Sequence, residues 1–282
     1  MFATLIDFAP MEWIDIGCNL SHESFAADWR GVVDEAIEAG VVQMVLTGAS
    51  ISGSRRSIEL AGQRPGHLFA TAGVHPHLAA DFDDDAARQL AEMHDQAGVL
   101  AVGECGLDYF RDIAPRRAQQ HAFEQQLALA ERCGKPVFLH QRDAHGDFHA
   151  ILGEFRDRLG PVVVHCFTDT RRALYDYLDL DCHIGITGWI CDERRGLELK
   201  DMVADIPDHR LMLETDAPYL KPRNLRPKAR THRNEPKWLP WIGGTVAALR
   251  NVSPAQLAAR TTANARTFFG IEEIAETVAT TG

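Results

Sequence analysis

The stretch LAVGECGLDYF, residues 100–110, begins as an apolar, strand-like run and delivers a carboxylate, Glu104, between two glycines. Burying a charged glutamate costs free energy unless the carboxylate is paired or binds a metal ion. The flanking Gly103 and Gly106 allow a neighbouring backbone to approach closely. The stretch therefore predicts a strand that ends in a functional site, and the partners of Glu104 must come from elsewhere in the chain.

Seven further segments of the 282-residue chain have the same strand-like character. Several are almost continuously apolar, as expected for strands that are covered on both faces. With 98–106, the expected strands are 12–20, 41–48, 67–76, 135–140, 160–167, 182–190 and 210–216. Helical patterns lie between them, for example at 28–40 and 115–134, and a final helix is expected at 254–269.

Eight alternating strand and helix units in about 250 residues predict a TIM-like (β/α)₈ barrel, an α/β fold of a single domain. A Rossmann-like sheet is the alternative, but no GxGxxG motif follows the first strand and no Walker sequence occurs. We expect the barrel domain to cover 12–282 and residues 1–11 to form an N-terminal extension.

The composition is that of an ordinary globular protein, with 45% hydrophobic and 24% charged residues. No apolar stretch reaches the roughly 18 residues that span a membrane. The N-terminus lacks the basic region of a signal peptide, and the six cysteines form no CxxC pair. We therefore expect a cytoplasmic protein with no membrane partner, and the sequence indicates no obligate protein partner. The net charge of −11 argues against nonspecific coating of nucleic acid.

Polar residues occupy the carboxyl ends of the expected strands, which meet at one mouth of a barrel. Side-chain alternation places Glu214 with Asp216, and His140 with Arg142, on the same face of their strands. The residues expected at the mouth are His75, His77, Glu104, His140, Arg142, His165, Phe167, Glu214 and Asp216.

Each of these histidines alone is more often structural than a metal ligand. Several histidines and carboxylates packed together without partners would be unstable, however, and a divalent cation compensates the carboxylates while using neutral imidazole as a ligand. We interpret Glu104 as a metal ligand that could bridge two ions. Oxygen ligands suit Mg²⁺ or Mn²⁺ and histidines admit Zn²⁺, so we expect Mg²⁺, as one or two ions, with the other two as alternatives.

One segment is strongly basic. Residues 221–237, KPRNLRPKARTHRNEPK, contain seven Lys or Arg residues and one acid. Most runs of this kind are solvated loops. This one follows the eighth strand directly, which in a barrel places it over the mouth.

The motifs GVHPH, GECGLD, HCFT, GITGWICDERRG, ETDAPYL and RNEP occur in this order. Together they closely resemble the TatD-type metal-dependent deoxyribonucleases, and the TatD subgroup in particular, from residue 12 to 270. The resemblance implies a TIM-barrel hydrolase of the amidohydrolase-like superfamily that cleaves DNA with a divalent metal. It further implies a 3′→5′ exonuclease on single strands, with RNA as a second substrate, and a role in DNA repair or degradation.

By motif, the resemblance places the metal ligands at Glu104, His140, His165 and Asp216. Asp216 is then expected to orient or deprotonate the attacking water, and Glu214 to act behind the ligands. His75 and Arg142 are candidates for holding phosphate oxygens.

Four further residues are candidates for binding the substrate. Phe167 could stack a base or simply pack in the core, and Asn19 could offer an oxygen ligand. Arg223 and Arg226, in the basic segment, are expected to attract the nucleic acid.

Two positions depart from the family pattern. Many members end the first strand with His-x-His, where this chain has Gly17 and Asn19, which puts a stable two-metal site in doubt. The family motif HCFTG reads HCFTD here, so that Asp169 adds a negative charge beside the mouth.

Two other functions are compatible with a barrel. A small-molecule metallohydrolase of the amidohydrolase type often carries a metal-bridging lysine on the fifth strand, where this chain has His140. A catalytically weak binding protein is disfavoured because the set of four candidate ligands is complete.

Overall fold

Eight parallel strands form one sheet in the computed structural model, which describes residues 11–226 and 231–274. The strand order follows the chain, and each strand pairs in parallel with the next. Two backbone hydrogen bonds bring the sheet edges together: Asp216 donates to Gly17 O at 2.8 Å, and Asn19 donates to Ala217 O at 2.7 Å. The strands are β1 Trp13–Cys18, β2 Val41–Leu46, β3 Leu68–Ala72, β4 Val99–Asp108, β5 Val137–Arg142, β6 Val162–Val164, β7 His183–Ile186 and β8 Leu211–Leu213.

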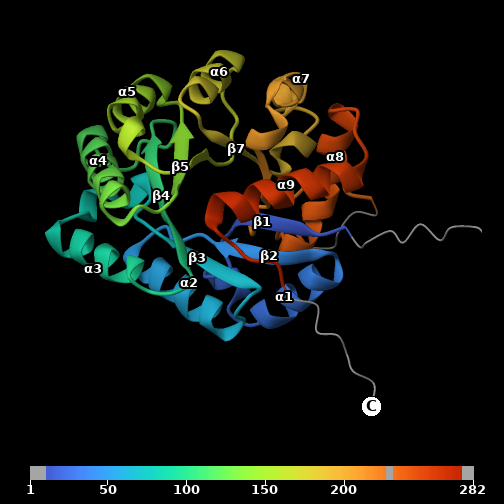
Figure 1. Cartoon of the computed structure of the whole chain (residues 1–282), viewed down its shortest axis with the longest axis horizontal. Helices are drawn as coiled ribbons and strands as arrows, with labels where there is room; N and C mark the ends of the chain where they lie inside the picture. The colour runs from blue at the N-terminus through green and yellow to red at the C-terminus, as the bar shows by residue number, and fades with distance from the viewer. Residues whose placement is uncertain (1–10, 227–230, 275–282) are drawn as a thin grey trace, which may run out of the picture.

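Helices surround these strands in chain order (Figure 1). They are α1 Trp29–Glu38, α2 Ile51–Gln63, α3 Asp84–His94, α4 Arg116–Cys133, α5 His145–Phe155, α6 Arg171–Asp179, α7 Leu197–Met202, α8 Leu239–Leu249 and α9 Pro254–Phe269. Short 3₁₀ turns in the loops include η2 Pro76–Asp81, η4 Gly188–Cys191 and η7 Pro236–Trp238. The predicted TIM-like barrel is confirmed.

The local sequence explains where the predicted helices begin and end. Pro115 precedes α4, and Gly134 ends it in the left-handed conformation that glycine adopts without strain. Helix α9 begins with a capping box in which the Ser253 side chain accepts from Gln256 N and the Gln256 side chain accepts from Ser253 N. The helices expected at 28–40, 115–134 and 254–269 are therefore confirmed.

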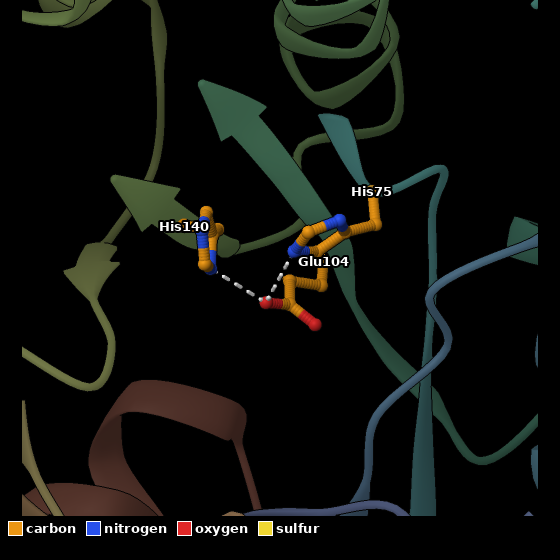
Figure 2. A group of neighbouring side chains, drawn as sticks. All are labelled: His75, Glu104 and His140. Carbon is orange, nitrogen blue, oxygen red and sulfur yellow. Dashed lines mark ion pairs between the residues drawn. The ribbon is translucent and has the colours of Figure 1, made fainter. Parts of the chain in front are cut away.

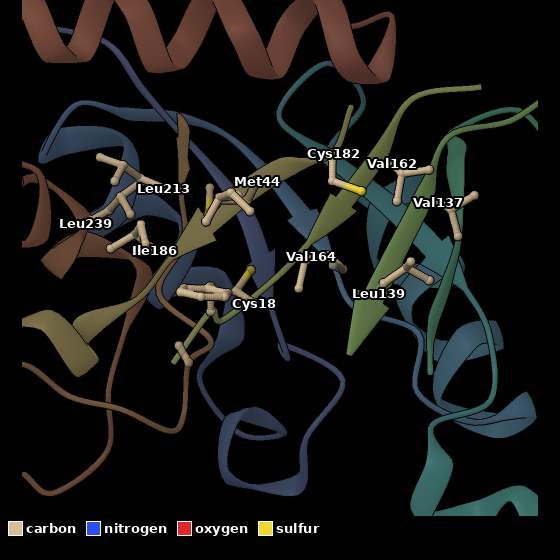
Figure 3. Packing of buried hydrophobic residues seen from close by; sticks show 14 of the residues in the cluster. Cys18, Met44, Val137, Leu139, Val162, Val164, Cys182, Ile186, Leu213 and Leu239 are labelled. Atoms are coloured by element: carbon tan, nitrogen blue, oxygen red, sulfur yellow. The ribbon is translucent and has the colours of Figure 1, made fainter. Parts of the chain in front are cut away.

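Most buried apolar residues belong to two clusters separated by the strands, and a small third cluster is formed by Ala79, Ala114 and Ala122. The outer cluster joins strands to helices and includes Val137 and Leu139 of β5 (Figure 3). The inner cluster fills the barrel and includes Phe138, the residue between them. This alternation is the two-residue period of a strand covered on both sides.

Helix α9 closes the barrel at the amino ends of the strands. Its residues Phe268 and Phe269 belong to the inner cluster. Asn264 Nδ2 donates to Leu211 O at the start of β8, and Thr262 Oγ1 donates to Glu12 O just before β1. The opposite end, where the polar residues gather, is therefore the end open to a substrate.

All eight expected strands are present, but β3, β6, β7 and β8 end earlier than the expected 67–76, 160–167, 182–190 and 210–216. The chain leaves the sheet before His165 and Glu214, and Cys166 and Asp216 then adopt positive φ angles of 47° and 52°. The expected extension, residues 1–11, lies outside the described residues except for Met11.

All six cysteines are free thiols, and four of them are buried. Across residues 11–226 and 231–274, no helix is both long and apolar enough to cross a membrane.

Candidate metal centre

A single carboxylate oxygen of Glu104 contacts three imidazoles. Glu104 Oε1 lies 2.8 Å from His165 Nε2, 3.0 Å from His140 Nδ1 and 3.5 Å from His75 Nε2. Figure 2 shows His75 and His140 converging on this oxygen from either side. Burial by itself would raise the pKa of Glu104, but the imidazoles outweigh it and hold this pKa well below its usual range. Glu104 is therefore an ionised carboxylate, and the three imidazoles that stabilise its charge all contact the same oxygen, Oε1.

Glycines on β4 place Glu104 at this point. Gly103 and Gly106 have φ angles of +133° and +142°. A Cβ at Gly106 would collide with the carbonyl of His140, and one at Gly103 would collide with that of Phe138. The predicted close approach of a neighbouring backbone is thus confirmed, and it brings β5, with His140, directly against Glu104.

The donor set fits a divalent cation. The ligand atoms of His75, Glu104 and His140 all lie within 4.8 Å of one another. His140 Nε2 is buried and has no hydrogen-bond partner in the described part of the chain; it lies 3.4 Å from Asp108 Oδ2 without hydrogen-bond geometry. A buried, unpaired imidazole nitrogen beside a carboxylate is the donor combination that Mg²⁺, Mn²⁺ or Zn²⁺ sites use.

Hydrogen bonds distinguish His75 from the other histidines. Its Nδ1 accepts from the backbone N–H of His77 at 3.1 Å. Burial lowers the pKa of His75 to about 3, so the ring is neutral, and its proton must then lie on Nε2. A protonated Nε2 donates a hydrogen bond but does not bind a metal, which favours the predicted phosphate-holding role over that of a ligand.

His165 has the opposite arrangement. Its Nδ1 faces Glu214 Oε2 at 3.3 Å while Nε2 faces Glu104. Burial would lower the pKa of His165, but the charges of Glu104 and Glu214 outweigh it and hold this pKa well above its usual range, so the metal-free ring is an imidazolium. With an ion in place of the Nε2 proton, the proton shared with Glu214 would stay on Nδ1 and orient the ring, as in the carboxylate–histidine pairs of metal sites.

Glu214 is held in a small enclosure behind His165. Its side chain is fully buried, and Cys166 N donates to Oε1 at 2.5 Å. Cβ atoms at Gly17 and Gly185 would each lie 2.5 Å from a Glu214 oxygen. The space that a larger side chain at position 17 would need is therefore already occupied by Glu214.

Asp216 and Asn19 lie next to each other although they are 197 residues apart in the sequence. Asn19 Nδ2 donates to Asp216 Oδ1 at 2.9 Å. Burial raises the pKa of Asp216 to about 7, the charge of His165 opposes this rise, and the charges of Glu104 and Glu214 add to it. Asp216 is thus a carboxylate that gains or loses a proton near neutral pH.

Two acidic residues that were not expected also belong to this region. Asp108 accepts from His77 Nε2 at 2.8 Å and lies beside His140. Its position four residues after Glu104 on the same strand could have indicated it.

Asp15 is fully buried, where it accepts from Thr215 N at 2.9 Å and Thr215 Oγ1 at 2.5 Å, and burial raises its pKa to about 8. It joins β1 to the segment after β8, and nothing local in the sequence indicates that pairing.

The expected substrate-binding residues fall into different surroundings. Arg142 lines a cavity of about 300 Å³ next to the centre. Phe167 is only 3% exposed and packs edge-on against Tyr177, which favours packing over stacking on a base. Arg223 pairs with Glu193 at 3.2 Å, and Arg226 donates to Leu225 O.

Most cations of the basic segment that are described already have acidic partners. Arg233 pairs with Asp28 at 2.7 Å, and Lys237 pairs with Glu35 at 2.5 Å, both near or on α1. Lys228 and Arg230 lie outside the described residues. The segment is therefore partly neutralised by the protein itself.

The family model described as TatD related DNase matches residues 14–270. The chain belongs to this family. It is 47% identical, over 90% of its length and 98% of the relative, to the 3′-5′ ssDNA/RNA exonuclease TatD of Pantoea vagans. The relative of the same name in Salmonella typhimurium is 44% identical over 91% of this chain and 98% of its own. Among solved structures, YJJV, a TatD homolog from Escherichia coli K12, superimposes with a TM-score of 0.85 at 27% identity, covering 94% of this chain and all of that one.

Proposed function

We propose that this TatD-family hydrolase is a metal-dependent nuclease that removes 5′-mononucleotides from the 3′ end of single-stranded DNA, and also of RNA. The observation that carries the proposal is the Glu104 oxygen shared by three imidazoles, beside the buried Asp216, at the open end of the barrel. The printed names of relatives that are 44–47% identical over nine-tenths of the chain support the substrate and the direction of cleavage.

Glu104, His140, His165 and Asp216 would hold the ion, for which Mg²⁺ is our choice and Mn²⁺ and Zn²⁺ are alternatives. When bound, such an ion supplies positive charge that stabilises the negative charge developing on the phosphodiester. The two imidazoles that are missing at Gly17 and Asn19 favour one firmly held ion, with a second held weakly or only with substrate.

Asp216 would take the proton of the attacking water. The Asn19 Nδ2 group fixes one Asp216 oxygen, and the single side-chain oxygen of Asn19, to which nothing donates within the described residues, would contact the ion or the substrate.

Three other side chains would bind or orient. Glu214 would keep the proton of His165 on Nδ1 and so hold the ring in position. His75 would donate its Nε2–H to a phosphate oxygen. The guanidinium of Arg142 would bind a second phosphate group through its edge.

Digestion of single-stranded oligonucleotides labelled at either end tests the proposal. Metal-stripped protein is supplied with Mg²⁺, Mn²⁺ or Zn²⁺, and the products are sized. We expect the 3′ label to appear at once as a mononucleotide, while the 5′ label passes through a ladder of shortening fragments. Full activity without metal, or cleavage mainly at internal sites, would contradict the proposal. A role in DNA repair or degradation and a cytoplasmic location stay predictions from the sequence.

A further inference from the structure

A recess opens directly beside the metal centre. We call it the mouth groove and define it by Phe110, Gln141, Arg142, Asp169, Trp189 and Glu198, which line a volume of about 300 Å³. This is at the small end of the range for ligand pockets, roughly 300–1,000 Å³. Gln141 and Arg142 directly follow His140 on β5, so at about 3.3 Å per residue the groove begins within two steps of the centre.

Aromatic and guanidinium groups form the walls of the groove. Phe110 is 54% exposed, so a ligand in the groove can reach its ring. The Arg142 guanidinium lies 4.0 Å from the Phe110 ring centroid and 5.9 Å from that of Trp189. Planar groups of this kind stack on any nucleobase.

The motif GITGWICDERRG, residues 185–196, holds Trp189 in place. Arg195 lies over the Trp189 ring at 4.5 Å, and Trp189 Nε1 donates to Arg195 O at 3.1 Å. Asp192, which is only 2% exposed, in turn accepts from Arg194 N and Arg195 N. The wall is thus preorganised, which lowers the entropy lost when a ligand binds.

A chain of hydrogen bonds fixes the orientation of Gln141. Its Nε2 donates to Asp169 Oδ2 and to Tyr177 Oη, each at 2.7 Å, so both amide hydrogens are used. Tyr177 Oη can then donate to His145 Nδ1, whose ring donates to Asp176. Within the described residues nothing donates to Gln141 Oε1, which is left as an acceptor beside the Asp169 carboxylate.

Apart from the Arg142 guanidinium, the charged groups of the groove oppose a phosphate group. Among the described residues that line the groove, Arg142 is the one basic side chain, against the acidic Asp169 and Glu198 and a further lining residue, Asp143. A neutral planar ring that carries N–H donors suits such surroundings better, because the acceptors gain partners and no negative charge is added.

We propose that the mouth groove binds the base of a nucleotide adjoining the scissile phosphate. The base stacks against Phe110, Arg142 and Trp189, and an exocyclic amino group donates to Gln141 and Asp169. This inference rests on the proposed nuclease function and adds a subsite and a base preference to it.

Oligonucleotides with one abasic residue test the subsite. The abasic residue is placed at the 3′ terminus, at the penultimate position or ten nucleotides away. We expect KM to rise about 5- to 100-fold for one of the two 3′ positions, because one stacked base is lost, while the distant residue has no effect. Equal KM values for all three strands would overturn the subsite. Failure of the wild-type protein to digest even the intact strand would instead overturn the nuclease function.

A variant cycle assigns the effect to the groove. On the intact strand, Trp189→Ala should raise KM by about the same factor as the abasic residue does for the wild-type protein. On the abasic strand that shows this rise, Trp189→Ala should add little, because the contact between Trp189 and the base is already missing. Tyr175→Ala, which removes a 48%-exposed aromatic side chain outside the groove, is the matched control and should change neither. Independent, multiplicative losses from Trp189→Ala and the abasic residue would show that the base lies elsewhere.

The base preference has a test of its own. Cytosine and uracil differ in that N4–H₂ donates where O4 accepts. At the sensitive position we expect a KM about 3- to 10-fold lower for deoxycytidine than for deoxyuridine. Asp169→Gly, which restores the residue of the family motif, should abolish this difference by raising the KM for deoxycytidine to that for deoxyuridine. Equal KM values for the two bases with wild-type protein would refute the amino-group contact.

Discussion

At the residue scale, the Glu104 oxygen that three imidazoles share explains why a carboxylate can be buried at the end of β4. The three rings do not act alike, because their second nitrogens have different partners. His165 is oriented by Glu214, His75 is protonated on Nε2 by virtue of its bond from His77, and His140 has a free buried nitrogen. Residue identity alone would make them equivalent.

Replacing Glu104 by glutamine keeps the shape of the side chain and removes its charge. We expect Glu104→Gln to lower kcat/KM by about 10³-fold or more, since several kcal/mol of transition-state stabilisation depend on the bound ion. Digestion kinetics and thermal unfolding are measured together. Glu124→Gln on the exposed face of α4 is the matched control. A folded Glu104→Gln protein with wild-type kinetics would be incompatible with a metal centre here.

The absence of a side chain at Gly17 predicts unequal metal binding. Glu214 occupies the adjoining space, so no imidazole replaces the one that many family members have. Calorimetric titration of metal-stripped protein should show one tighter site and a second that is weak or requires substrate. Two tight sites of equal affinity would mean that unrecognised groups replace the missing ligands.

At the scale of elements, the close contact of β4 with β5 places Glu104 against His140, and it depends on glycines. Gly106→Ala should lower the free energy of unfolding by at least about 2 kcal/mol, because φ is +142° and the new Cβ meets the His140 carbonyl. Urea denaturation measures it. Gly153→Ala in α5, where a Cβ meets nothing within 4 Å, should instead stabilise by about 0.5–1 kcal/mol. Equal changes in the free energy of unfolding for the two variants would show that β4 can move away from β5 without loss of stability.

The packing of α3 on β3 makes stability depend on pH. His94 Nε2 bonds Ala72 O at 3.0 Å, and burial lowers the pKa of His94 from 6.5 to about 4. Between pH 6.5 and about pH 4, His94 binds a proton in the unfolded chain but not in the folded protein. The contribution of His94 to the free energy of unfolding is therefore fully present above pH 6.5 and is lost as the pH drops toward 4.

The loss should amount to about 3 kcal/mol in the free energy of unfolding, measured by denaturation at each pH. His94→Gln should remove this part of the pH dependence, whereas His121→Gln on the exposed face of α4 should leave it. An unchanged profile for His94→Gln would assign the acid sensitivity to other groups.

At the scale of the whole molecule, a protein of net charge −11 must still attract a polyanion. The basic segment 221–237 helps less than its composition suggests, because Arg233 and Lys237 are bound to acids near α1. At physiological salt, charges that lie more than about 8 Å apart are largely screened from each other. Cations close to the substrate can therefore attract it although the protein as a whole is acidic. Arg223 and Arg226 are the described cations of this segment that we propose as substrate contacts.

The salt dependence of binding tests this proposal. Each phosphate neutralised contributes about 0.7 log units of affinity per log unit of salt for a single strand. Changing Arg223 and Arg226 to Gln should lower that slope by about 0.7–1.4 and raise KM more than it lowers kcat. Arg233→Gln, in the same segment but paired with Asp28 and Glu235, should lower stability and leave the slope unchanged. Identical slopes for all three proteins would remove the segment from the substrate path.

Sequence periodicity was sufficient for the barrel and for much of the centre. All eight strands and the helices at 28–40, 115–134 and 254–269 follow from apolar runs, helical patterns and caps, because these signals are local. His140 and Arg142 on one strand, and Glu104 between glycines, follow from spacing in the same way. The extension at 1–11 and the extent of the domain to residue 282 stay predictions.

Only the tertiary structure decided which groups are partners, since those contacts join residues far apart in the chain. Asp15 with Thr215, and Asn19 with Asp216, meet because β1 and the segment after β8 close the barrel. The sequence could not tell Phe167, which is buried, from Phe110, which is exposed in the groove, because both follow strands that end at the mouth. Nor could it tell which cations of the basic segment are already neutralised. Local pattern determines which face a side chain takes, but its partner is determined by the packing of the whole chain.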